Sequence, residues 1–285
     1  MSVELRPSST LAFAELVELF DRAYEGYEIP FRLDETIVRL MVDTYDLDLD
    51  ASRVAFSRGE AVGLGNLGLR GEDVWIGGVG VVPSARRQGI AEELMRALHE
   101  QARERGVRNV WLEVIDRNSG AYDLYLKLGY RVTRELEVWS LPAEAGDSAA
   151  REVSAEEAHA RVRELGRARE PWQRADGTLA NLDDLRGLLT DDGAAVFRVT
   201  SAVQLLQIAG GGAEEMLRSL RRLGPVSVLN LPADDPASEA LRGLRATPTV
   251  RQREMVLELN RARLGPRWRS GSASSLRSPG RSRTT

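Results

Sequence analysis

Glu113 and Tyr125 are the side chains whose type and setting first suggest proton-transfer chemistry. Glu113 lies within the apolar run Val110–Val114, where a carboxylate is unusual because an unpaired buried charge is costly. Burial also raises the pKa of a carboxyl group, which makes Glu113 a candidate general base. The alternative for Glu113 is a strand residue whose side chain reaches solvent, and the alternative for Tyr125 is a core tyrosine on a helix.

The stretch Val79–Ala91 is typical of a strand, a turn and the start of a helix. Pro83 ends the strand, because proline cannot donate a ladder hydrogen bond. Arg86, Gly89 and Ala91 then form an R-x-x-G-x-A pattern, whose small residues leave the unpaired N–H groups of a helix start open to a phosphate. The alternative is an ordinary strand–helix connection. The chain has neither a G-x-x-x-x-G-K-[ST] loop nor a G-x-G-x-x-G fingerprint followed by a suitably placed acid.

Hydrophobic periodicity and the positions of Gly and Pro predict the elements that position these residues. The expected order is strand 3–6, helix 11–24, helix 34–45, three antiparallel strands at 53–57, 61–70 and 73–82, helix 91–105, strand 110–114, helix 121–128 and closing strands within 130–141. Because a crossover helix joins them, strands 73–82 and 110–114 should pair in parallel. The loop 24–31 carries tyrosines and acids that would suit a substrate amine, or else ordinary half-buried packing.

Two motifs in this order resemble the signatures of the GNAT superfamily of N-acetyltransferases. The first is the Arg86-x-x-Gly89-x-Ala91 turn. The second is Leu112-Glu113-Val114 followed by Asn118, Ala121, Leu124-Tyr125 and Leu128-Gly129-Tyr130. The resemblance covers roughly residues 3–141, and within the superfamily it is strongest to the ribosomal-protein alanine N-acetyltransferases. It implies the GNAT fold, an α/β (α+β) architecture with a mixed sheet.

The resemblance also implies an enzyme, with acetyl-CoA as cosubstrate and no metal. Glu113 would be the general base, directly or through water, and Tyr125 the general acid for the departing thiolate. Backbone groups of Val79, Gly80 and Val81 and the side chain of Asn118 would hold the acyl and pantetheine parts, and the pyrophosphate would rest on Arg86, Arg87, Gln88, Gly89, Ile90, Ala91 and Glu92.

The acceptor expected from this resemblance is a primary amine. It would be a protein N-terminus or, as in tandem GNAT proteins such as mycothiol synthase, a small aminated metabolite. The alternative of another class is an acyl-CoA-binding sensor or scaffold without turnover.

Beyond a small, polar linker at 143–154, the pattern of the first half repeats in weakened form. Ala213–Arg218 repeats Ala91–Arg96, and in the continuing register Leu241 replaces Tyr125 and Leu229 replaces Glu113. The expected elements are a hairpin of 195–201 and 203–209, helix 213–223, strand 226–231, helix 237–244 and strand 253–259. We therefore expect a catalytic domain at 1–142 and a degenerate, non-catalytic GNAT-like domain at 155–263. The alternative for the latter is an unrelated α+β domain.

Composition excludes several other kinds of chemistry. The 285-residue chain has no cysteine and two histidines, which excludes disulfides, thiolate metal sites and a cysteine nucleophile. His99 is expected on the surface of its helix, among charged neighbours. The net charge is −4, and the arginine-rich tail at 264–285, which is expected to be disordered, makes the rest of the chain more acidic than this value. An acidic body argues against nucleic acid as a partner and fits a cationic amine. No apolar run approaches a membrane span, so we expect a cytoplasmic monomer or homodimer without a membrane partner.

Overall fold

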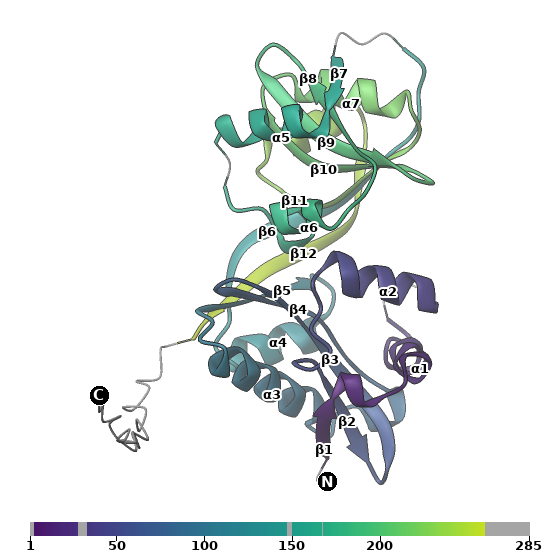
Figure 1. The fold of residues 1–285 in the computed structure, drawn as a ribbon, viewed down its shortest axis with the longest axis vertical. Coiled ribbons are helices and arrows are strands. Elements are labelled where there is room, and N and C mark those ends of the chain that lie inside the picture. The colour runs from purple at the N-terminus through teal and green to yellow at the C-terminus, as the bar shows by residue number, and fades with distance from the viewer. Residues whose placement is uncertain (1–2, 28–32, 147–149, 167, 260–285) are drawn as a thin grey trace, which may run out of the picture.

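The computed structural model describes residues 3–27, 33–146, 150–166 and 168–259. Its elements form two lobes, one from each half of the chain, joined by two long strands (Figure 1). A single twelve-stranded sheet runs through both lobes. The predicted mixed α/β architecture is therefore confirmed.

The first half begins with a strand and two helices, as predicted. Its elements are β1 (Glu4–Pro7), η1 (Ser8–Thr10), α1 (Phe13–Ala23), α2 (Glu35–Thr44), β2 (Arg53–Ser57), β3 (Glu60–Arg70), β4 (Asp73–Val81), η2 (Pro83–Ala85), α3 (Ile90–Glu104), β5 (Asn109–Ile115), α4 (Ser119–Lys127) and β6 (Arg131–Leu141). The antiparallel meander of β2, β3 and β4 is confirmed, and so is the parallel pairing of β4 with β5.

The second half contains every element predicted for it and several that were not. Its elements are β7 (Arg151–Ser154), α5 (Ala155–Glu164), η3 (Trp172–Arg174), α6 (Asp176–Ala180), β8 (Leu185–Leu189), β9 (Gly193–Val199), β10 (Val203–Gly210), α7 (Ala213–Arg221), β11 (Val226–Pro232), α8 (Pro236–Gly243) and β12 (Thr247–Glu258). α5, α6 and β8 were not predicted, and β7 takes up the end of the predicted linker. The tail predicted to be disordered, 264–285, lies outside the described residues.

The internal repeat is visible in the strand pairing. In the first half β4 and β5 run parallel only over Asp73–Trp75 and Asn109–Trp111. In the second half β10 and β11 run parallel only over Val203–Leu205 and Val226–Val228. Each of these pairs is followed by a register shift in the hairpin of β4 or β10 with the strand before it. The two halves therefore share an arrangement in which two parallel strands meet briefly and then diverge.

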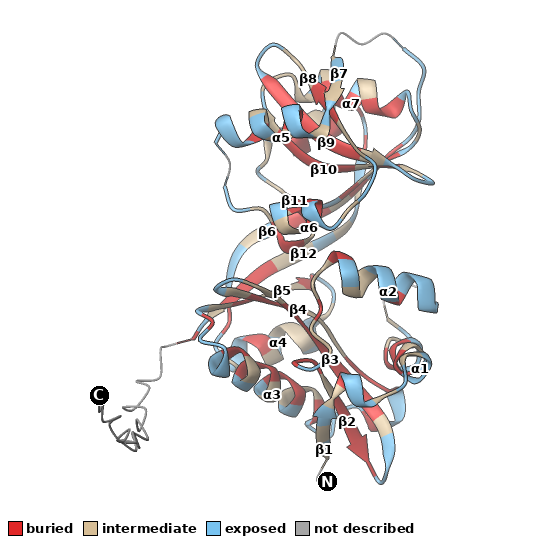
Figure 2. Cartoon of the chain, viewed as in Figure 1, coloured by how far each residue is buried: buried red, intermediate tan, exposed pale blue. Residues whose placement is uncertain are grey.

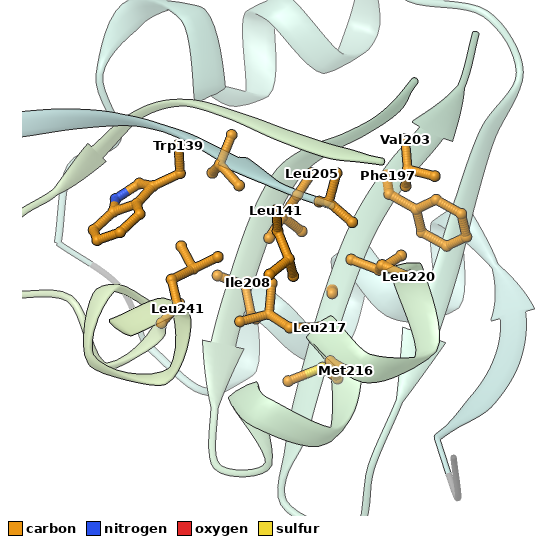
Figure 3. Packing of buried hydrophobic residues seen from close by; sticks show 14 of the residues in the cluster. Trp139, Leu141, Phe197, Val203, Leu205, Ile208, Met216, Leu217, Leu220 and Leu241 are labelled. Carbon is orange, nitrogen blue, oxygen red and sulfur yellow. The ribbon is translucent and has the colours of Figure 1, made fainter. Parts of the chain in front are cut away.

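The last strand of each half is exchanged with that of the other. The order across the sheet is β1-β2-β3-β4-β5-β12-β6-β11-β10-β9-β8-β7, so β12 lies between β5 and β6. Trp139 and Leu141 of β6 are buried in the core of the second half (Figure 3), whereas Met255 of β12 is buried in the core of the first. Residues 130–141, predicted to supply closing strands, thus form the single strand β6, which pairs with β12 and β11 and not with β5.

Three large apolar clusters form the cores of the two lobes. Two lie in the first half, where α1 and α3 cover the sheet, and one lies in the second half beneath α7 and α8. The buried residues follow the sheet through both lobes and line the inner faces of α3 and α7 (Figure 2). β6 packs in the core of the second half and β12 in that of the first, so neither half of the chain builds its core alone. The separate domains expected at 1–142 and 155–263 stay a prediction.

His99 is buried, and the prediction of a surface position is wrong. Only 3% of the residue is exposed, and its Nε2 lies 2.8 Å from the hydroxyl of Tyr130. Burial, with a contribution from nearby arginines, lowers the pKa of His99 to about 4. The charged neighbours in the sequence were misleading because His99 stands one turn after Met95, at the edge of the buried stripe of α3.

Candidate active site

The site begins where β4 and β5 separate. Their pairing stops at Trp75 and Trp111, and in the hairpin of β3 with β4 the extra residue is Gly77. At Gly78, which follows at φ +149°, an added Cβ would lie 2.1 Å from the hydroxyl of Tyr24. A side chain there is excluded by this contact, and beyond it the edge of β4 that faces β5 has no strand paired to it among the described residues.

A cleft of about 770 Å³ opens at this separation. It lies between β4, the start of α3, α4 and the end of α1. Of the residues predicted to hold acetyl-CoA, ten line it: Val79, Gly80, Val81, Arg86, Arg87, Gly89, Ile90, Ala91, Glu92 and Asn118. Tyr125 lines it as well, whereas Gln88 and Glu113 do not.

The N-terminus of α3 is suited to bind an anion. Gly89 is its N-cap residue and has φ +85°, a left-handed conformation that glycine adopts at little cost. No side chain caps this helix, and no atom lies within 4 Å of the place where a Cβ on Gly89 would stand. The first N–H groups of the helix therefore face open space, which fits a pyrophosphate.

The two arginines of the turn have different surroundings. The guanidinium of Arg86 donates to the backbone carbonyls of Val81, Ala23 and Glu25 at 2.9, 3.2 and 2.7 Å. It thus fastens the end of α1 to β4. Arg87 is exposed and has a positive φ of +64°. Arg87, rather than Arg86, is the side chain of this pair that can meet a phosphate.

Opposite charges bridge α3 and α4 at the mouth of the cleft. Glu92 accepts from Lys127 of α4 at 2.6 Å and from Arg96 at 2.7 Å. Hydrogen bonds from these two cations lower the pKa of Glu92. Asn118 caps α4 by accepting from the N–H of Ala121 at 3.2 Å, so a ligand in the cleft would meet its NH₂ group. Lys127 was not predicted, because it stands at a position where neither motif specifies a residue.

Tyr125 reaches the cleft from the buried face of α4. It is 8% exposed, and its ring lies 5.8 Å from that of Tyr130. Burial raises the pKa of the Tyr125 hydroxyl well above its usual value, and Tyr27 and Glu113 contribute in the same direction. Tyr125 is therefore protonated at neutral pH and can donate a hydrogen bond into the cleft.

Glu113 lies on the opposite face of β5 from the apolar cluster that contains Leu112 and Val114. Its Oε2 accepts from the indole N–H of Trp75 at 2.8 Å and from the amide of Gln173 at 3.2 Å. Its Oε1 is buried and has no hydrogen-bond partner among the described residues. Glu113 is thus held by one donor from each half of the chain.

Burial raises the pKa of Glu113 from 4.5 to about 7. The hydrogen bond from Trp75 opposes this rise, Glu254 adds to it, and Gln173 and Arg169 oppose it. A carboxyl group with a pKa near 7 ionises at neutral pH and can then accept a proton from an amine.

The second half covers the Glu113 side of the sheet through η3 and α6. Trp172 stacks on Trp75, with ring centroids 6.0 Å apart, and donates to the carbonyl of Tyr45 at 3.0 Å. Arg70 of β3 donates to the carbonyl of Trp172 and to the hydroxyl of Thr178. This contact between the halves was not predicted, because no local pattern links residue 173 to residue 113.

The predicted substrate loop 24–31 is described only in part. Tyr24 and Tyr27 line the cleft, and their rings meet edge to face at 5.3 Å. Residues 28–32 lie outside the described residues, so their part in a substrate site stays a prediction.

In the second half the space in front of α7 is filled by the chain itself. Its N-cap, Gly212, is left-handed like Gly89. A Cβ added to Gly212 would lie 2.7 Å from the hydroxyl of Thr190, and one added to Gly211 would lie 2.0 Å from the carboxylate of Asp192. A phosphate would clash with these side chains and be repelled by Asp192, which supports the prediction that this half holds no acetyl-CoA.

The comparison with protein families gives one match, and it covers this site. The family described as "Acetyltransferase (GNAT) family" matches residues 13–130, which include α1 to α4, the cleft, Glu113 and Tyr125. Residues 13–130 are a GNAT acetyltransferase domain. Both motifs that resemble GNAT signatures lie within this domain.

Relatives and solved structures extend the likeness beyond this GNAT domain. A thialysine N-epsilon-acetyltransferase of Bos taurus is 33% identical over 70 residues, 25% of this chain and 41% of its own. The chain spans between 20% and 41% of the length of the curated relatives it matches. A GCN5-related N-acetyltransferase from Sphaerobacter thermophilus is 15% identical, with a TM-score of 0.70 over 90% of this chain and 95% of its own. The tandem GNAT protein from the clavulanic acid biosynthesis pathway is 16% identical, with a TM-score of 0.63 over 90% and 98%. The 90% of the chain that these comparisons cover therefore has the fold of GNAT proteins, including a tandem one.

Metal and membrane features can be stated for the described part of the chain. There, no three or more His, Cys, Asp or Glu side chains are grouped so that they could hold a metal ion. In the same residues, none of the helices combines the length and the apolar character needed to cross a membrane.

Proposed function

We propose that the chain is an acetyl-CoA-dependent N-acetyltransferase with one working site, in its first half. The observation that supports this most is the cleft at the separation of β4 and β5. It joins an open helix start, suited to an anion, to the protonated Tyr125, whose hydroxyl interacts electrostatically with Glu113, a carboxyl group with a pKa near 7. Acetyl-CoA, when bound, supplies the activated acetyl thioester.

The residues of the cleft divide the binding of this cosubstrate between them. The N–H groups at the start of α3 and the side chain of Arg87 would hold the pyrophosphate. The unpaired edge of β4 at Val79–Val81 and the amide of Asn118 would hold the pantetheine arm and the acetyl carbonyl. Such donors stabilise an oxyanion because they are fixed before the reaction begins.

Proton transfer falls to Glu113 and Tyr125. An alkyl ammonium has a pKa near 10, so the amine must lose a proton before it can attack the thioester. Glu113 would take that proton on Oε1, the oxygen that lacks a partner, directly or through a water. Tyr125 would donate to the sulfur as thiolate character develops, since its hydroxyl stays protonated at neutral pH.

The acceptor that fits best is a small amine. Trp172 and Gln173 cover the Glu113 side of the sheet, which leaves less room for a protein N-terminus than an open face would. The relative from Bos taurus is named for the Nε-amine of thialysine, a small molecule.

The test is to screen small amines and peptides for release of free CoA, with acetyl-CoA affinity measured separately. Because the chain has no cysteine, a thiol reagent detects CoA without background from the protein. Release with at least one amine, lowered about 10²- to 10⁴-fold in Glu113→Gln, would support the proposal. If acetyl-CoA binds tightly and no amine leads to release of CoA, the hypothesis of an acyl-CoA-binding sensor or scaffold would replace this proposal.

A further inference from the structure

A second cavity, of about 60 Å³, lies between the two halves. Thr44 and Tyr45 at the end of α2 form its wall on one side, and Gln173, Arg174, Arg198 and Leu229 belong to its wall on the other. Its described lining contains two arginines and no carboxylate. This volume exceeds what a single water needs, so the cavity has room for a small polar group.

Arg174 has an unused donor in this cavity wall. Its side chain is 1% exposed, Nε donates to Glu170 at 3.0 Å, and Nη1 makes long contacts with the carbonyls of Leu205 and Leu229 at 3.3 and 3.5 Å. Nη2 is buried and has no partner among the described residues. A buried charged donor left without an acceptor is costly, so the wall is suited to receive one.

One further donor of the wall also lacks a partner. The hydroxyl of Thr44 is buried without a hydrogen-bond partner in the described part of the chain. Arg198 adds a second positive charge, and its Nε donates to Gln204 at 2.6 Å. With two cations and no acid in the lining, the ligand that matches this wall is an anion with lone pairs to accept hydrogen bonds.

The internal repeat relates this cavity to the face of the sheet on which Glu113 lies. Leu229 occupies the position of Glu113, and Ser227, which also lines the cavity, occupies that of Trp111. The parallel pairing of Val226–Val228 with β10, like that of β5 with β4, supports this register. The cavity therefore lies on the face of the second half that corresponds to the Glu113 face of the first.

Gln173 connects the cavity with Glu113. Its Nε2 donates to Oε2 of Glu113, while the same side chain lines the cavity. Tyr45 lines the cavity too and stands edge-on to Trp75, the other donor to Glu113, at 5.5 Å. One layer of side chains thus separates the carboxyl group from the arginines.

We propose that this cavity is a carboxylate subsite for the acceptor, so that the preferred substrate is an aminocarboxylate. This inference rests on the proposed function, because it takes Glu113 as the group that meets the acceptor's amine. The carboxylate of the acceptor would accept from Nη2 of Arg174 and pair with Arg198. The amine end would then lie toward Glu113, from which the side chain of Gln173 separates the cavity.

The experiment uses the full chain and paired probes. Aminocarboxylates from glycine to lysine are each compared with the corresponding carboxamide, first by calorimetric binding in the presence of CoA and then by kcat/KM for CoA release. We expect at least one acid to bind and react about tenfold or more better than its amide, the ratio typical of a charged hydrogen bond. Arg198→Gln should bring that ratio to within about twofold by weakening binding of the acid. Arg218→Gln, which removes a surface charge on α7, should leave it unchanged.

Two further experiments distinguish the possible sources of the carboxylate and test the second arginine. Peptides that end in a free carboxylate, tested against the same peptides with an amidated end, show whether the carboxylate comes from a free amino acid or from a peptide terminus. Arg174→Gln should act like Arg198→Gln, with circular dichroism to confirm folding, and Arg198→Gln alone decides the matter if this buried change unfolds the chain. Equal binding of every acid and its amide would overturn the subsite even if amines react. Absence of CoA release with all probes would overturn the proposed function, while binding still tests the subsite.

Discussion

Glu113 and Gln173 belong to different halves of the chain and share a hydrogen bond of 3.2 Å. Gln173 is held in place by its neighbour Trp172, which stacks on Trp75 and donates to the carbonyl of Tyr45. Trp75 in turn is the second donor to Glu113. The second half, predicted to be without a catalytic role, therefore contributes to the surroundings of the proposed base.

Gln173→Leu should shift the pH dependence of turnover. The amide of Gln173 stabilises the ionised carboxylate, so its loss raises the pKa of Glu113 above about 7. Because the base acts only when ionised, the rising limb of kcat/KM should move to higher pH by about one pH unit. Trp75→Phe should shift the limb in the same direction, and Gln101→Leu on the surface of α3 should not. An unmoved limb in Gln173→Leu would show that this bond does not tune the base.

Glu113→Gln should make the unfolding free energy of the chain fall less as the pH rises from about 4.5 to 8. The pKa of Glu113 is about 7 in the folded chain against 4.5 for an ordinary glutamate, so folding favours its protonated form. The stability that this provides is complete below about pH 4.5 and is lost as the pH rises to about 7. The difference in unfolding free energy between variant and wild type should therefore grow in the variant's favour by up to about 3 kcal/mol from pH 4.5 to pH 8. Denaturant unfolding at both pH values measures it, and a constant difference would contradict the raised pKa.

The residues predicted to hold acetyl-CoA lie in short motifs, and ten of them line one cleft. The turn from Arg86 to Glu92 was predicted from its local spacing and Asn118 only from the resemblance, and their roles in binding stay predictions. The partners of Glu113 could not be predicted in this way, because Gln173 is 60 residues distant and only the packing of Trp172 brings it near. The contact by which Arg86 fastens α1 to β4 could not be predicted either, because its guanidinium donates to backbone carbonyls, and every residue has a backbone carbonyl.

The exchange of strands was hidden for a related reason. β6 and β12 each carry apolar residues that either core can bury, so the sequence indicates a strand without indicating its neighbour. The choice is made by Trp139 and Leu141, which fill the core beneath α7 and α8, and by Met255, which fills the other. Strand structure was predicted in both regions, although β12 begins at Thr247 and not at residue 253, and the order of the strands could not be predicted.

Arg87→Gly should weaken acetyl-CoA binding by about 1.5 to 3 kcal/mol, roughly 10- to 150-fold, the range for a hydrogen bond to a charged group. Glycine is preferred to alanine here because residue 87 has φ +64°, which alanine adopts only with strain. Arg58→Gly is the matched control, since Arg58 is also exposed and has φ +53°, in the turn between β2 and β3. Calorimetric titration of acetyl-CoA measures both variants. Equal affinities would remove Arg87 from the pyrophosphate site.

Tyr125→Phe should lower kcat by roughly 10- to 10⁴-fold, the upper part being typical of a lost general acid, with acetyl-CoA affinity little changed. Phenylalanine keeps the ring contact with Tyr130, so packing is conserved. Tyr130→Phe is the control: it deprives His99 of its hydroxyl partner and should cost about 1 to 3 kcal/mol of stability while sparing kcat. Steady-state kinetics and thermal unfolding of both variants separate the two roles. Full activity in Tyr125→Phe would exclude it as the acid.

Leu241→Ala tests whether the second half influences catalysis through its core or only through its contact with Glu113. Leu241 stands at the position equivalent to Tyr125, is fully buried and packs in the cluster that contains Trp139 and Leu217 (Figure 3). Its truncation should cost about 2 to 5 kcal/mol of stability, as cavities in apolar cores do. Because β6 and β12 tie both cores into one sheet, both halves should unfold in a single, earlier transition.

The folded fraction of Leu241→Ala should keep the wild-type kcat and the wild-type position of the pH limb, in contrast to Gln173→Leu. Denaturant unfolding followed by tryptophan fluorescence and by far-ultraviolet circular dichroism gives the stability and tests for coincident transitions. Kinetics well below the unfolding midpoint give kcat. A shifted pH limb in Leu241→Ala would mean that the core of the second half, and not Gln173 alone, sets the pKa of Glu113, because a cavity beneath α8 has no direct contact with that carboxyl group.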